Sequence, residues 1–144
     1  MQAADKKPIL FACSGCSNAG QLANDVAHEL DRLGVAEMSC LAGIGAAKPL
    51  FLKKLQQREV WVIDGCPIHC SLGVFNQVHE HIDVHIRLHD LGVKKQAAAP
   101  IGEALNTLID DVLQDIESQR TSTQPSPATP LNRNEVMIRE LNVE

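Results

Sequence analysis

The sequence predicts an α/β fold, with a mainly parallel sheet of four strands between helices on both of its faces. Three observations predict it. Short apolar runs typical of strands alternate with segments of helical periodicity, and this happens four times along the chain. Two of the runs are apolar throughout, as are strands buried on both faces of a parallel sheet. The 144 residues are enough for one such domain and too few for two.

The first two strand-helix units occupy the amino-terminal half of the chain. Residues 8–12 are an apolar run that predicts the first strand, and leucine and valine recur at helical spacing over residues 19–33. Residues 35–40 alternate polar and apolar side chains and predict the second strand. We expect a loop over residues 41–45, followed by a helix that has Pro49 in its first turn.

The third and fourth units follow the same pattern. Residues 59–64 contain a continuous apolar stretch and predict the third strand, and a helix is expected over residues 70–81. Residues 84–89 alternate again and predict the fourth strand. The last helix carries an apolar stripe between residues 101 and 116.

The polarity of the strands predicts their order in the sheet. The first and third strands are apolar on both faces and should be central, whereas the alternating second and fourth strands should lie at the edges. The expected order is therefore 2-1-3-4. Right-handed crossovers then place the first and last helices on one face and the others on the opposite face, a three-layer flavodoxin-like or Rossmann-like arrangement.

The composition changes after about Gln119. Residues 1–119 are expected to form a cysteine-rich α/β metal-binding domain. Residues 120–144 begin with a segment rich in proline, serine and threonine that cannot bury a core. We therefore expect a flexible linker and tail there.

Charge and composition exclude several classes of partner. The net charge of −5 gives no attraction to nucleic acid or to an anionic membrane. The chain has only four aromatic residues, three Phe and one Trp, on which the bases of a single-stranded nucleic acid could stack. No apolar run has the length of a membrane span or of a signal-peptide core, so we expect a cytoplasmic protein. In a reducing compartment, clustered cysteines indicate metal binding or redox chemistry rather than structural disulfides.

All five cysteines are expected at one edge of the sheet. Cys13 and Cys16 follow the first strand, Cys40 closes the second, and Cys66 and Cys70 follow the third. Ligands of open α/β sheets bind at the carboxyl ends of the strands, where the strand order reverses. The cysteine positions therefore predict a binding site in that crevice.

The spacing of the cysteines suits a soft divalent metal such as Zn²⁺. The pairs Cys13/Cys16 and Cys66/Cys70 can supply four thiolates to one tetrahedral ion, with Cys40 as a reserve ligand. Two alternatives stay open. A Cys-x-x-Cys at the start of a helix is also the arrangement of thiol-disulfide oxidoreductases, and four cysteines can hold an iron-sulfur cluster.

Histidines add candidates of a weaker kind. His69 lies between Cys66 and Cys70 and could be a ligand or a proton carrier. Four further histidines fall on different elements, so they are not expected to form a second metal site, and only His89 is placed to neighbour the crevice. They are His79, His81, His85 and His89.

Three charged residues complete the candidates near the crevice. Asp64 could orient a metal ligand or cap the helix that follows it. Lys94 and Lys95 follow the fourth strand, where they could offset a thiolate-rich site or attract a small anion. Besides the metal ion, a small anion or a protein thiol is therefore the candidate partner.

Four motifs resemble, in the same order, those of the DGC-domain family, which is named after Asp64-Gly65-Cys66. They are Cys13-Ser14-Gly15-Cys16-Ser17, Glu37-Met38-Ser39-Cys40-Leu41-Ala42-Gly43-Ile44-Gly45, Asp64-Gly65-Cys66-Pro67 with Cys70, and Gly92-Val93-Lys94-Lys95. The resemblance covers about residues 9–95. It implies a small bacterial α/β protein whose cysteines form zinc sites and to which no defined reaction is attached. The family pattern has four cysteines and this chain has five, which leaves open which four bind.

The function expected from the sequence is thus zinc binding by clustered cysteines, in metal or thiol homeostasis. Thiol-disulfide exchange and iron-sulfur electron transfer remain its alternatives.

Overall fold

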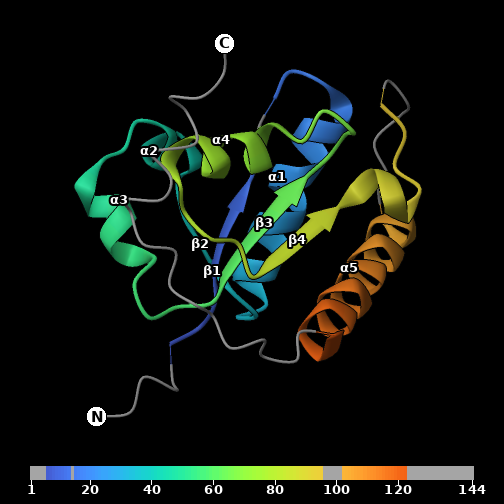
Figure 1. Cartoon of the computed structure of the whole chain (residues 1–144). Helices are drawn as coiled ribbons and strands as arrows, with labels where there is room; N and C mark the ends of the chain where they lie inside the picture. Colours follow the sequence, from blue (N-terminus) through green and yellow to red (C-terminus); the bar gives the residue numbers. More distant parts are fainter. Residues whose placement is uncertain (1–5, 14, 96–101, 123–144) are drawn as a thin grey trace.

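A computed structural model describes residues 6–13, 15–95 and 102–122. They form three layers, with one parallel sheet between two layers of helices (Figure 1). The sheet has four strands in the order β2-β1-β3-β4, so the predicted fold class and strand order are confirmed. The strands are β1 (Ile9–Ala12), β2 (Glu37–Met38), β3 (Val60–Asp64) and β4 (Val84–Arg87).

The central strands are buried as their sequences predict. Every residue of β1 and β3 is buried, whereas β4 alternates between buried and more exposed positions. The second strand is shorter than the expected 35–40 because its pairing with β1 is limited to Glu37 and Met38.

Helices connect the strands and continue beyond them. They are α1 (Asn18–Arg32), α2 (Leu41–Gly45), α3 (Pro49–Lys54), α4 (Cys70–Val78), the 3₁₀ helix η2 (Leu88–Leu91) and α5 (Glu103–Ser122). The expectation of a loop over residues 41–45 was wrong. That segment forms α2, which buries Ile44, and Gly43 lets the Phe51 ring pack against the backbone because a Cβ there would lie 2.2 Å from Phe51 Cδ2.

One helix and one strand end earlier than their sequence patterns predict. Helix α4 ends at Val78 rather than at residue 81, because His79 adopts a left-handed conformation with φ of 58°. The fourth strand ends at Arg87, and His89 belongs to η2 instead of the strand. Both differences are local changes of backbone direction that side-chain periodicity does not report.

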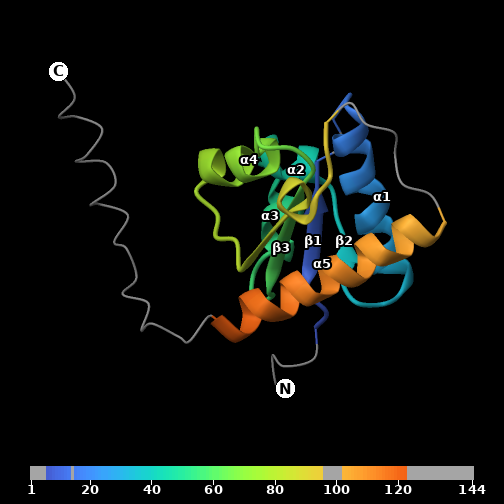
Figure 2. The ribbon, with the colours of Figure 1, turned by 90° about the vertical axis from the view of Figure 1, so that its right-hand side faces the viewer.

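The sheet separates two hydrophobic cores. Helices α1 and α5 pack on one face, around residues such as Trp61 and Ile86, and α2, α3 and α4 cover the other, around Phe11 and Phe75 (Figure 2). The expected pairing of the first and last helices on one face is therefore confirmed.

Gly65 allows β3 to end directly against the first turn of α1. A Cβ at Gly65 would lie 2.0 Å from the carbonyl oxygen of Ala19, a contact that only a backbone shift could relieve. The close approach brings the segment after β3 next to the segment after β1. The glycine of the Asp64-Gly65-Cys66 motif thus positions the two cysteine loops side by side.

Helix α5 is fastened to the outer strand of the sheet by one side chain. The Gln119 amide accepts a hydrogen bond from the His85 N–H and donates one to the His85 carbonyl oxygen, both at 2.9 Å. The helix continues to Ser122, and its last buried apolar residue is Ile116. Residues 120–122 of the expected flexible tail instead belong to α5, and the rest of it, residues 123–144, lies outside the described residues, as do Pro100 and Ile101 before the helix.

Removing residues 123–144 is expected to change the free energy of unfolding by no more than about 0.5 kcal/mol, because the described cores end at Ile116. Thermal and urea unfolding of the chain ending at Ser122 measure this. A chain ending at Asp115, which lacks Ile116, is the control and should melt at a lower temperature. Equal losses in both truncated chains would place the tail within the domain.

No helix of the described part of the chain is long and apolar enough to cross a membrane.

Candidate metal and thiol site

The five cysteines lie where β1, β2 and β3 pass into their following segments. Cys13 comes directly after β1, and Cys16 lies just before α1. Cys40 is the residue before α2, Cys66 is in the turn after β3, and Cys70 is the first residue of α4. All five are free thiols at the carboxyl edge of the parallel sheet.

Cys13 is the cysteine most strongly influenced by its neighbours. Burial raises the pKa of its thiol, and a hydrogen bond from the Gly15 N–H lowers it in part. The negative charges of Asp64, Cys70 and Cys66 raise the pKa further. The Cys13 N–H donates a hydrogen bond to the Ile63 carbonyl oxygen at 3.0 Å, and Gly65 packs against Ala19, so the loops after β1 and β3 lie side by side.

Three of the remaining cysteines are more accessible than Cys13. Cys16, Cys40 and Cys70 are exposed, and Cys66 is half-buried. Among residues 6–13, 15–95 and 102–122, no three cysteine, histidine or acidic side chains are already gathered around one point as metal ligands. The cysteines are therefore neighbours at one sheet edge rather than a closed tetrahedral set.

Cys13 is expected to react with iodoacetamide at least several-fold more slowly than Cys16 or Cys70 in metal-free protein. Its raised pKa leaves less thiolate, and its partial burial limits access. Peptide mass spectrometry after timed alkylation at mildly alkaline pH measures the three rates. Equal rates in the native chain would contradict the expectation, and urea-unfolded protein is the control in which the difference should vanish.

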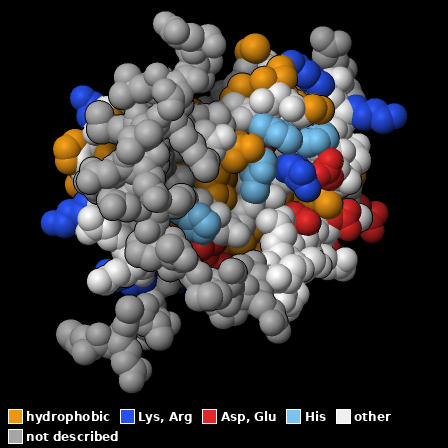
Figure 3. Space-filling view, in the orientation of Figure 1, with side chains coloured by type: hydrophobic (Ala, Val, Ile, Leu, Met, Phe, Trp, Pro, Cys, Tyr) orange, Lys and Arg blue, Asp and Glu red, His pale blue; other side chains and the backbone are white. Residues whose placement is uncertain are grey.

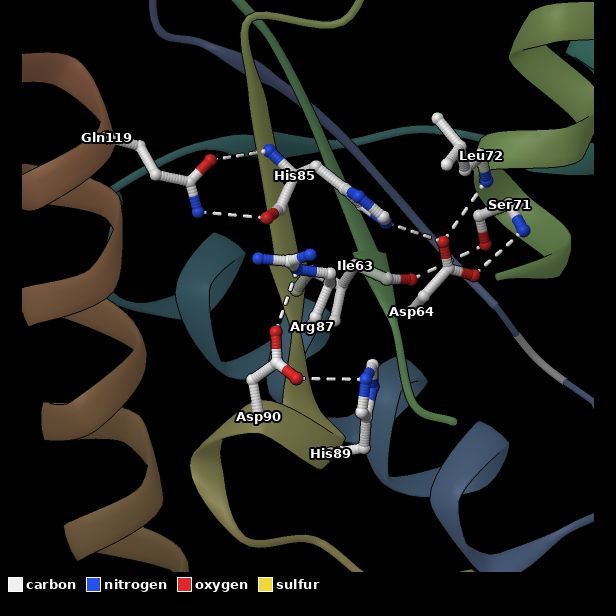
Figure 4. A network of polar contacts seen from close by, with 9 residues as sticks. All are labelled: Ile63, Asp64, Ser71, Leu72, His85, Arg87, His89, Asp90 and Gln119. Carbon is white, nitrogen blue, oxygen red and sulfur yellow. Dashed lines mark hydrogen bonds and ion pairs between the residues drawn. The ribbon is translucent and has the colours of Figure 1, made fainter. Parts of the chain in front are cut away.

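Asp64 lies at the base of the site and connects three elements. Its side chain is 1% exposed at the end of β3. Oδ1 accepts a hydrogen bond from the Ser71 N–H at 2.8 Å, and Oδ2 accepts from the Leu72 N–H at 3.1 Å and from His85 Nε2 at 2.8 Å (Figure 4). The residue before α4, His69, is left-handed and its side chain caps nothing. Asp64 therefore caps α4 from the neighbouring strand.

The hydrogen bonds keep Asp64 ionised. Burial alone would raise its pKa, but the bonds from His85, Ser71 and Leu72 outweigh burial and lower the pKa below its usual value. A carboxylate is thus fixed beside the cysteine loops, where it favours cations.

The structure gathers three histidines, of which the sequence placed His69 and His89 near the crevice but not His85. The His69 ring centre lies 5.2 Å from that of His85 and 5.1 Å from that of His89. His89 Nε2 lies 2.9 Å from a carboxylate oxygen of Asp90, and Figure 3 shows histidine side chains gathered on this face beside acidic and basic ones. His69 Nε2 and His89 Nδ1 are buried and, within the described chain, have no hydrogen-bond partner.

One sequence signal could have revealed part of this cluster. Val62 pairs with His85 and Asp64 with Arg87 in the parallel register, so side chains two positions apart on β3 and β4 share one face. His85 was expected on the polar side of an edge strand. That side is in fact the face that α4 covers, which is why His85 contacts Asp64.

Lys94 and Lys95 are exposed after η2. The carbonyl oxygen of Lys94 accepts a hydrogen bond from the Asn18 side chain at 3.0 Å, which ties this loop to the start of α1. A hollow of about 320 Å³ borders Lys94 between α1 and α5. Recognition of a small anion by the two lysines stays a prediction.

Comparisons with known proteins identify the family. The model of the DGC domain matches residues 9–116. The chain is 46% identical over 94 residues, 64% of its own length and 71% of the relative's, to the anaerobic and virulence modulator AnvM of Pseudomonas aeruginosa. No solved structure matches the chain. The expected resemblance is confirmed, and the chain belongs to the DGC-domain family.

Proposed function

We propose that the protein binds about one zinc ion through Cys13, Cys16, Cys66 and Cys70, with Cys40 as the reserve ligand. The observation that carries this proposal is that the two cysteine loops lie side by side: the Cys13 N–H donates a hydrogen bond to the Ile63 carbonyl oxygen at 3.0 Å, and Gly65, next to Cys66, packs against the first turn of α1. Core packing gives no reason for thiols of separate loops to approach one another at an accessible sheet edge.

Charge supports a cation at this position. The negative charges of Asp64, Cys66 and Cys70 disfavour ionisation of Cys13 in the metal-free chain. A divalent ion reverses this effect, because each thiol loses its proton on binding and the resulting thiolate then interacts with a positive charge. Zn²⁺ bonds to thiolate sulfur at about 2.3 Å, so the loops after β1 and β3 would close around the ion.

The role of the metal is proposed to be regulatory, in metal or thiol homeostasis. The relative AnvM is named as an anaerobic and virulence modulator, a description of regulation rather than of a reaction. A site whose cysteines are largely exposed gains or loses metal, or becomes oxidised, in response to its surroundings. The proposed zinc site would therefore report those conditions.

Thiol-disulfide exchange is the second candidate, and the position of Cys70 favours it. Cys70 is exposed and is the first residue of α4, so the disulfide of a partner protein can reach its thiol. In this mechanism one thiolate attacks a disulfide of a partner protein and forms a mixed disulfide. A second cysteine, such as Cys66, then displaces the partner's thiol.

Metal analysis and thiol titration of one anaerobic, untagged preparation separate the candidates. Zinc binding predicts about one zinc per chain and thiols that become reactive only when a strong chelator removes the metal. A redox pair predicts no bound metal and two additional thiols on reduction. Iron, sulfide and visible absorbance would instead identify an iron-sulfur cluster. Either of the last two results would overturn the zinc proposal.

A further inference from the structure

We propose that His69, His85 and His89 form a second metal site, which binds a divalent transition-metal ion through imidazole nitrogens. The three rings lie in contact beside the cysteine loops. This site is distinct from the thiolate site in its donors, and it does not depend on whether zinc binds to the cysteines.

Two buried nitrogens lack the partner that burial requires. The Asp90 carboxylate can only accept a hydrogen bond, so in the neutral imidazole His89 Nε2 carries the proton and Nδ1 carries the lone pair. That Nδ1 and His69 Nε2 are both buried without a partner among the described residues. Leaving a buried polar atom unsatisfied is unfavourable, and a metal ion would satisfy both nitrogens at once as lone-pair donors.

The spacing of the rings fits a shared ion. With metal-nitrogen bonds of about 2.0–2.1 Å, two imidazoles on one tetrahedral ion have ring centres roughly 5 Å apart. His69 lies 5.1 Å from His89 and 5.2 Å from His85 by the same measure. Both pairs therefore have the ring separation of ligands to a common metal.

Two of the three rings are hydrogen-bonded to carboxylates, as metal-binding histidines in proteins commonly are. Asp64 binds His85 Nε2 and Asp90 binds His89 Nε2. Such a carboxylate fixes which nitrogen is protonated, orients the ring and makes the other nitrogen a better donor. In both histidines this leaves Nδ1 as the metal-binding atom.

The imidazole nitrogens must move closer together when the ion binds. In the metal-free chain no three ligand atoms within the described ranges converge on one point, so at least one ring rotates on binding. His85 and His89 have side chains 19% and 22% exposed, which gives an ion access and the rings room to move. Imidazole donors suit Zn²⁺, Ni²⁺ and Cu²⁺, with water completing the coordination.

Copper(II) binding to a chain with blocked thiols tests this site separately from the cysteines. The untagged full-length protein is stripped with a chelator, alkylated at all cysteines, checked by circular dichroism and titrated with Cu²⁺ alone. We expect one tightly bound ion whose electron paramagnetic resonance spectrum shows coupling to several imidazole nitrogens. Zinc analysis of the unblocked protein tests the thiolate site, so either site can fail without the other.

Variants identify the ligands. His69→Ala and His89→Ala should weaken Cu²⁺ binding at least 10-fold, and Asp90→Asn, an exposed change that spares the fold, should weaken it about 10- to 100-fold. His28→Ala removes an exposed histidine of α1 and is the matched control, with unchanged affinity expected. Unchanged affinity in the His69, His89 and Asp90 variants, or no nitrogen-coupled copper in the alkylated chain, would show that the three rings only pack together.

Discussion

Replacing Asp64 with alanine should lower the free energy of unfolding by about 3–5 kcal/mol, the usual cost of removing one partner from a buried charged contact. The substitution leaves the Ser71 and Leu72 N–H groups at the start of α4 without their acceptor, and it frees His85 from β3. Each buried donor left unsatisfied carries a penalty of its own. Urea unfolding followed by circular dichroism measures the loss.

Asp90→Ala is the matched control for this prediction. Asp90 also contacts a histidine, His89, and in addition Arg87, but its side chain is 46% exposed. Exposed ion pairs contribute about 0–1 kcal/mol, so the control should lose far less stability than Asp64→Ala. Similar losses in the two variants would contradict the role of Asp64 as the buried cap of α4.

The stabilisation by Asp64 also has a defined pH dependence. Because its pKa is lower in the folded chain than in the unfolded one, its contribution is complete above the unfolded value of about 4. The contribution falls as the pH drops below that value and is lost once the pH passes the folded pKa. Wild-type stability should therefore decline more steeply in acid than that of Asp64→Asn, and parallel profiles would contradict the assignment.

Cys66→Ser is expected to reduce the zinc content from about one ion per chain to near zero, since a serine hydroxyl stays protonated at neutral pH and is a poor ligand for zinc. Cys66 follows Gly65, which packs against the first turn of α1, and is followed by Cys70 in the same loop, so its loss removes the link between the two pairs. Elemental analysis of anaerobically purified variants gives the stoichiometry.

Cys40→Ser serves as the comparison because Cys40 belongs to a separate segment, between β2 and α2, and is exposed. It should retain its zinc. Loss of zinc from Cys40→Ser with retention in Cys66→Ser would exchange the roles of the two residues. Retention in both, together with full zinc in the wild type, would place the ion elsewhere.

The strand order could be predicted because burial on both faces is visible in the side chains themselves. Residues 9–12 and 60–64 have no polar face apart from Asp64, and only central strands of a parallel sheet have such surroundings. The short helix over residues 41–45 could not be predicted in the same way. Its two glycines disfavour a helix, and it forms because Ile44 is buried by tertiary packing.

The cysteine edge followed from the strand assignments, whereas the histidine cluster did not. His69 reaches His85 and His89 because it is left-handed, with φ of 54°, and no periodicity reports a single residue in that conformation. His89 enters the cluster because the chain turns into η2 after Arg87. Both depend on backbone turns that tertiary contacts decide.

The Gln119 amide affects whether the edge of the sheet can pair with a strand of another molecule. In the outer strand β4, the N–H and C=O of His85 face away from β3, where an incoming strand from another chain would pair. Unpaired groups of this kind make sheet edges templates for aggregation. Gln119 occupies both groups with the pattern of bonds that a foreign strand would make. One side chain of α5 thus blocks edge-to-edge sheet extension at this position.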